Sequence, residues 1–86
     1  MSNDLRLVWG RLEQEITDVR WARRNVYRQL AAWPIHLKPR EVQRIVAVVL
    51  HPRYARVRRA MTTCERSGMV LDPSRLCRLW GVRDAA

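Results

Sequence analysis

The sequence predicts an all-α fold in which two or three shorter helices pack against one long N-terminal helix. Two observations indicate this. Apolar side chains recur every three or four residues through the first third of the chain, which is the period of an α-helix. Prolines and glycines then divide the remainder into segments of helical length, and no pair of strand-like segments is visible. With 86 residues, we expect one domain, 1–86, with one modest core.

The long helix is predicted over residues 3–33, with a length of about 45 Å. Pro34 ends it, because the residue before a proline avoids the α conformation. If Arg23 is counted as a member, the apolar stripe alternates steps of four and three residues over about four heptads. Arg23 then either fixes the register of a coiled coil or extends from the edge of a broader face. The apolar members are Leu5, Trp9, Leu12, Ile16, Val19, Val26, Leu30 and Trp33.

The length of this helix indicates a homodimer. A helix this long exceeds what a compact domain of this size needs, so either the rest of the chain or a second copy must cover its stripe. Its charges fit the second possibility, because an acidic segment precedes a basic one and an antiparallel twin would pair them. The acidic residues are Glu13, Glu15 and Asp18.

The rest of the chain is predicted to form helices over residues 39–50, 52–67 and 73–80. Pro39 suits a first helical position, and we expect His51-Pro52 to end the first of the three. The run from Ile45 to Leu50 is rich in β-branched residues, so a strand is the alternative there. Helix is favoured because polar residues fall on the opposite face and no partner strand is visible.

The end of the chain carries clear helix boundaries. Gly68 is a candidate C-terminal cap for the 52–67 helix. Asp72 can cap the last helix, Pro73 suits its first position, and Gly81 ends it. We therefore expect Leu76, Cys77 and Trp80 of the 73–80 helix to face the core.

Positive charge dominates the composition. The chain has 17 basic residues, all but one of them arginine, against 8 acidic residues, for a net charge of +9. Residues 1–33 carry six basic and four acidic side chains, and residues 34–86 carry eleven and four. A charge surplus of this size on a small body attracts polyanions, so nucleic acid or an acidic protein surface is the expected partner.

Arginines form a stripe on the predicted 52–67 helix, opposite its apolar face. Such a row can follow the phosphate backbone of a nucleic acid, and each neutralised phosphate adds to the salt dependence of binding. The alternative is a solvated helix face without a ligand. The stripe consists of Arg53, Arg56, Arg59 and Arg66, and Arg58 lies beside it.

A second basic row lies on the outer side of the long helix and consists of Arg20, Arg24 and Arg28. Trp21 lies next to it and off the apolar stripe. A tryptophan among arginines can stack on a base or on a guanidinium group. The alternative is that Trp21 packs against a neighbouring helix.

Two functions of different class fit these features. The first is a small nucleic-acid-binding protein, regulatory or architectural, that contacts phosphates through its arginine faces. Nothing in these rows reads base edges, so weak sequence preference is expected. The alternative is an adaptor or inhibitor, like many small basic helical proteins of phages and plasmids, that docks on an acidic partner.

An enzyme is not expected. The sequence has no glycine-rich phosphate loop and no visible nucleophile–base pair, so we predict no catalytic residue, no cofactor and no small-molecule substrate. A metal site is not expected either. The candidate ligands, His36, His51, Cys64 and Cys77, lack close zinc-finger spacing.

The sequence also favours a cytoplasmic protein. Cys64 and Cys77 are expected to be reduced core residues, since a small secreted scaffold usually carries more cysteines. The charged N-terminal segment does not resemble a signal peptide. The longest apolar run, Ile45 to Leu50, is too short to cross a bilayer, so no membrane contact is expected.

Overall fold

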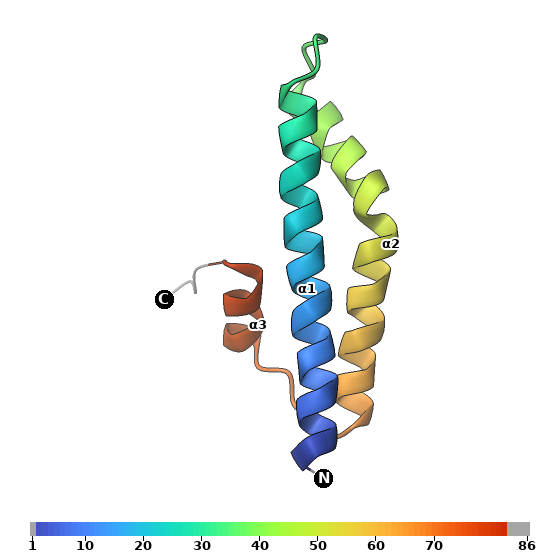
Figure 1. Ribbon diagram of the computed structural model, residues 1–86, viewed down its shortest axis with the longest axis vertical. Coiled ribbons are helices and arrows are strands. Elements are labelled where there is room, and N and C mark those ends of the chain that lie inside the picture. Colours follow the sequence, from blue (N-terminus) through green and yellow to red (C-terminus); the bar gives the residue numbers. More distant parts are fainter. Residues whose placement is uncertain (1, 83–86) are drawn as a thin grey trace.

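The computed structural model describes residues 2–82, and within them it confirms the all-α prediction. The helices are α1 (Ser2–Ala31), α2 (Pro39–Arg66) and α3 (Pro73–Trp80). Figure 1 shows that α1 and α2 form an antiparallel hairpin, with the short α3 beside α1 on the side away from α2. The molecule is long and flat, with extents of 53 × 30 × 16 Å. A flat hairpin leaves much of each long helix accessible to solvent.

The core between the helices divides into two clusters. The cluster towards the open end of the hairpin includes contributions from α3, whereas the cluster towards its tip comes from α1, α2 and the connection between them. The predicted stripe of α1 is buried at Leu12, Ile16, Val19 and Leu30. From α2, Val57, Ala60 and Cys64 belong to the first cluster, and Val46 and Leu50 to the second.

Helix α2 corrects the prediction of two separate helices over 39–50 and 52–67, because it continues through Pro52. Proline has no N–H for the Val48 carbonyl four residues earlier, and its ring crowds that turn. Both Pro52 and Val48 are exposed, so water can satisfy the unpaired carbonyl. Figure 1 shows α2 bowed along its length, so the proline is accommodated in a curved helix and does not end it.

Local capping explains where α2 and α3 begin and where α3 ends. The Glu41 carboxylate accepts a hydrogen bond from the Lys38 backbone N–H at 2.9 Å, before the first turn of α2. The Asp72 carboxylate accepts one from the Ser74 backbone N–H at 3.1 Å. Gly81 ends α3 with a φ of 72°, a left-handed conformation that glycine adopts without steric cost.

Arg23 follows the spacing of the apolar stripe of α1. Its side chain is exposed, and its guanidinium lies 5.7 Å from the centre of the Tyr27 ring. This agrees with the interpretation that Arg23 extends from a broad face over an aromatic neighbour.

The accessible surface is large for the mass of the chain. It measures 7112 Å², whereas a compact monomer of 10.2 kDa exposes about 5,300 Å². The difference reflects the flat shape, in which α1 and α2 cover each other on one side only. None of the described helices is long and apolar enough to cross a membrane.

Candidate anion-binding surface

The second half of α2 carries arginines on its solvent side. Val57, Ala60 and Cys64 turn towards α1, so helical periodicity directs the intervening residues outwards. We define the α2 arginine face as Arg56, Arg58, Arg59 and Arg66, all of which are exposed. Within residues 2–82 none of these four guanidinium groups lies in an ion pair. The face therefore presents positive charge that no carboxylate of the described chain neutralises.

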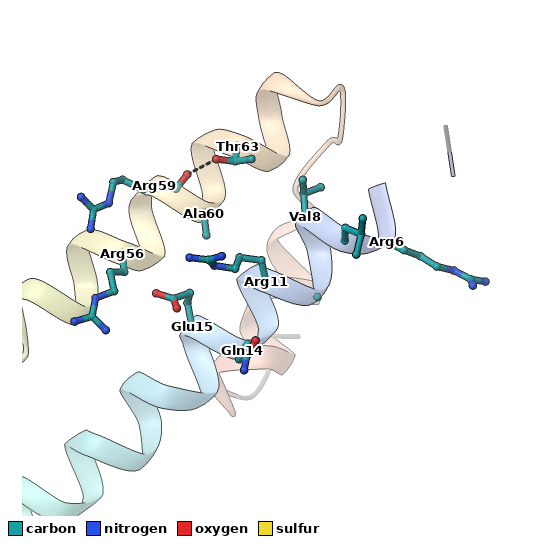
Figure 2. A pocket seen from close by; sticks show the side chains of 11 residues that line it. Arg6, Val8, Arg11, Gln14, Glu15, Arg56, Arg59, Ala60 and Thr63 are labelled. Carbon is teal, nitrogen blue, oxygen red and sulfur yellow. Dashed lines mark hydrogen bonds between the residues drawn. The ribbon is translucent and has the colours of Figure 1, made fainter. Parts of the chain in front are cut away.

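Arg56 and Arg59 line a groove between α1 and α2, at the open end of the hairpin (Figure 2). The groove is open and holds about 960 Å³. From the opposite wall, Arg11 of α1 extends towards the same space, whereas Arg6 points away from it. Apolar side chains complete the lining, namely Leu7, Val8 and Ala60. Arginine side chains from both helices therefore line one groove.

The arginine face continues around α2 beyond this groove. Arg58, Arg59 and Arg66 line a shallow hollow on the outer side of α2, together with Thr62 and Thr63. Arg59 belongs to both the groove and the hollow. The Thr63 hydroxyl donates a hydrogen bond to the Arg59 carbonyl at 3.0 Å (Figure 2). The surface is therefore continuous from Arg11 through Arg59 to Arg66.

Asp18 shares a neighbouring hollow with Arg11 and Arg56, and the acidic residue in the lining of the groove itself is Glu15. The Glu15 carboxylate lines the groove. Figure 2 shows it next to the guanidinium of Arg11 and directed towards α2, which carries Arg56. No ion pair within 4.0 Å joins Glu15 to either arginine. Its negative charge lowers the positive potential of the groove without neutralising a particular guanidinium.

Arg53, predicted as part of the arginine stripe, is engaged inside the molecule. Its Nε lies 3.2 Å from Asp18 Oδ2 of α1, and both side chains are partly exposed. The Nε–H is not aligned for a hydrogen bond, so the contact is an ion pair alone. The charge of Arg53 is therefore partly neutralised by Asp18, unlike the charges of the α2 arginine face.

The second predicted row, on α1, is likewise divided. Arg20 donates a hydrogen bond from Nη1 to the Leu79 carbonyl of α3 at 3.0 Å, so it holds two helices together. Arg24 and Arg28 are exposed. Trp21 is 63% exposed, so within the monomer it does not pack against a neighbouring helix.

Arg11 is the residue of this surface that the sequence alone did not indicate. It lies far from Arg56 in the chain, and no motif links them. The hairpin brings them together because α1 and α2 run antiparallel about the connection at Pro34 (Figure 1). If the predicted 3–33 and 52–67 helices had been paired antiparallel, this pairing would have placed Arg11 opposite the arginine stripe.

The two cysteines differ in burial, since Cys64 is buried and Cys77 is partly buried. Cys64 and Cys77 are both free thiols. Cys64 is buried and donates to the Val8 carbonyl at 3.4 Å, and this burial raises the pKa of its thiol. Among residues 2–82, no group of three or more histidine, cysteine, aspartate and glutamate side chains is placed to hold a metal ion.

Comparison with known protein families, with curated proteins and with solved structures found no match to this chain. The assignment of function therefore depends on the chemistry of the surface described above.

Proposed function

We propose that this protein binds nucleic acid, DNA in the first instance, by contacts between arginine guanidinium groups and backbone phosphates. The observation that supports this most strongly is the continuous, exposed surface formed by Arg11 and the α2 arginine face, in which no guanidinium has an ion-pair partner among the described residues. A guanidinium group offers paired N–H donors that match phosphate oxygens.

The geometry of α2 suits a backbone contact. Arg56 and Arg66 lie ten residues apart, which corresponds to about 15 Å along the helix axis. Several phosphates of one strand fit within that length, because each strand carries one about every 3.4 Å of duplex axis. Contacts of this kind set affinity and position and carry no sequence information by themselves. A regulatory or architectural role with weak sequence preference follows from this chemistry.

An acidic protein partner is the second candidate. Apolar side chains near the hairpin tip are well exposed, with Trp33 at 50%, Ile35 at 66% and Val48 at 74%. The surplus accessible surface is about 1,800 Å², and a standard interface takes about 800 Å² from each partner. A second copy of the chain could cover the same area, as the homodimer predicted from the long helix would require. The two free thiols fit a reducing compartment such as the cytoplasm.

The test is a fluorescence-anisotropy titration of labelled DNA with the purified protein, at salt concentrations of about 50 mM and 200 mM. We expect a Kd near micromolar at the lower salt. Five phosphate contacts, one for Arg11 and one for each arginine of the α2 arginine face, give a slope of log K against log salt of about −4.5 on duplex DNA. An absence of binding at about 50 mM salt would rule out this function and leave the acidic protein partner.

A further inference from the structure

Four of the six aromatic rings lie against another ring or a guanidinium group inside the molecule. The guanidinium of Arg75 lies 3.9 Å from the centre of the Trp9 ring. That of Arg23 lies over Tyr27. Tyr54 and Trp80 pack together, with ring centres 6.2 Å apart. The other two, Trp21 and Trp33, are at least half exposed and have no such partner among the described residues.

Trp21 differs from Trp33 in its surroundings. On the α1 helix, Arg24 and Arg28 follow Trp21 by one and two turns, so all three side chains share the outer side of the helix. Trp33 has no arginine or lysine within four residues on either side. Ala22, the neighbour of Trp21 in sequence, is buried. Trp21 is therefore a bare indole on a solvent-facing side of α1 that also carries two exposed guanidinium groups.

We infer that the nucleic acid bound by this protein is single-stranded, and that one of its bases stacks on Trp21. This inference rests on the proposed function. Sequence-tolerant binding of single strands combines cationic contacts to the backbone with bases stacked on aromatic side chains. Trp21 supplies the stacking surface, and Arg24 and Arg28 supply charge for the phosphates beside it. In a duplex the base faces are covered by their neighbours, so Trp21 would have nothing to stack on.

The test compares an oligothymidylate of about 16 nucleotides, the upper end of known site sizes, with a duplex of equal length. We expect wild type to bind the single strand more tightly. Trp21→Ala should raise its Kd for the single strand about tenfold and leave that for the duplex unchanged. Trp21→Phe should retain most of the affinity. Trp33→Ala is the matched control, since it removes an exposed indole away from arginines, and it should bind like wild type.

Indole fluorescence gives a second readout that a structural role of Trp21 would not change. We expect the single strand to quench emission of wild type more than emission of Trp21→Phe. Absence of binding to either nucleic acid would overturn the proposed function and this inference together. Binding that prefers the duplex, or that Trp21→Ala leaves unchanged on both nucleic acids, would overturn this inference alone and leave the phosphate-binding function in place.

Discussion

Arg20 of α1 donates a hydrogen bond from its guanidinium to the Leu79 backbone carbonyl in the last turn of α3, at 3.0 Å. The carbonyls at a helix C-terminus lack partners within the helix and carry partial negative charge, so a cation there satisfies both needs. Gly81 lies against the same guanidinium, since a Cβ atom at that position would be 2.5 Å from Arg20 Nη2. Arg20 therefore joins a short helix of eight residues to the hairpin.

Removing this guanidinium should loosen α3. We expect Arg20→Ala to lower the free energy of unfolding by about 1–1.5 kcal/mol, measured by urea denaturation. Amide hydrogen exchange in α3 should accelerate more than exchange in α2. Arg44→Ala removes an exposed arginine from α2 and serves as the control, with little expected change in stability. Equal stability of Arg20→Ala and Arg44→Ala would contradict the proposed contact.

Gly81→Ala probes the same contact from α3. A residue other than glycine at a φ of 72° costs about 1–2 kcal/mol, and the new Cβ also displaces the Arg20 guanidinium. We expect the substitution to cost more in wild type than in an Arg20→Ala background, where only the backbone cost remains. A double-mutant cycle of urea unfolding measures the difference. A coupling energy of zero would show that Gly81 and Arg20 are independent.

Pro52 should limit the stability of α2. Pro52→Ala restores an N–H that can bond to the Val48 carbonyl, and alanine has the highest helix propensity. We expect the free energy of unfolding to rise by about 1–3 kcal/mol in urea denaturation. Pro39→Ala, at a first helical position that suits proline, should change it by less than about 0.5 kcal/mol. A loss of stability in Pro52→Ala would mean that packing on α1 requires the proline.

The positions of α1 and α3 could be predicted because their boundaries are set locally. Pro34 follows the end of α1, and Asp72 and Gly81 cap α3 with their own side chain and backbone. The continuity of α2 could not be predicted in the same way. Leu50 and Tyr54, on either side of Pro52, both pack in the tip cluster, and this tertiary packing outweighs the local preference of proline to end a helix.

The sequence alone also could not predict which arginines remain free to contact a ligand. Helical periodicity predicts that Arg20 and Arg53 lie outside the apolar stripes. It does not predict their partners, Leu79 and Asp18, because these belong to other helices. Arg11 entered the site for the same reason, because the hairpin alone places it opposite Arg56. Contacts between helices thus decided which guanidinium groups remain free.

The buried thiol of Cys64 should make stability depend on pH. Burial, assisted by the charge of Glu65, raises the pKa of this thiol above its ordinary value of 9.0. The folded state therefore holds the thiol proton more tightly than the unfolded chain. The stability that depends on the protonated thiol is present in full below pH 9.0 and is lost as the pH rises further. Urea denaturation between about pH 8 and pH 10 should show a steeper decline for wild type than for Cys64→Ala. Parallel declines would contradict this.

Glu15 should weaken the binding of polyanions. Its carboxylate lines the groove with Arg11 and Arg56, so Glu15→Gln removes a repulsive charge from the site. We expect the affinity for nucleic acid to rise about two- to fivefold in the anisotropy titration, as for the loss of one exposed charge interaction. Gln14→Glu adds a charge to the same groove and should lower the affinity. A lower affinity for Glu15→Gln, a higher affinity for Gln14→Glu, or no effect of either would exclude the groove from the binding surface.

The salt dependence of two double variants tests the central claim most directly. Arg56→Ala with Arg59→Ala removes two charges from the arginine face, and Arg40→Ala with Arg44→Ala removes two exposed charges from the other end of α2. The first variant should bind nucleic acid more weakly and reduce the slope of log K against log salt by about 1.8 on duplex DNA or about 1.4 on a single strand, because each phosphate contact contributes about 0.9 or about 0.7. The second should keep the wild-type slope. Equal slopes for the two variants would contradict binding by this face.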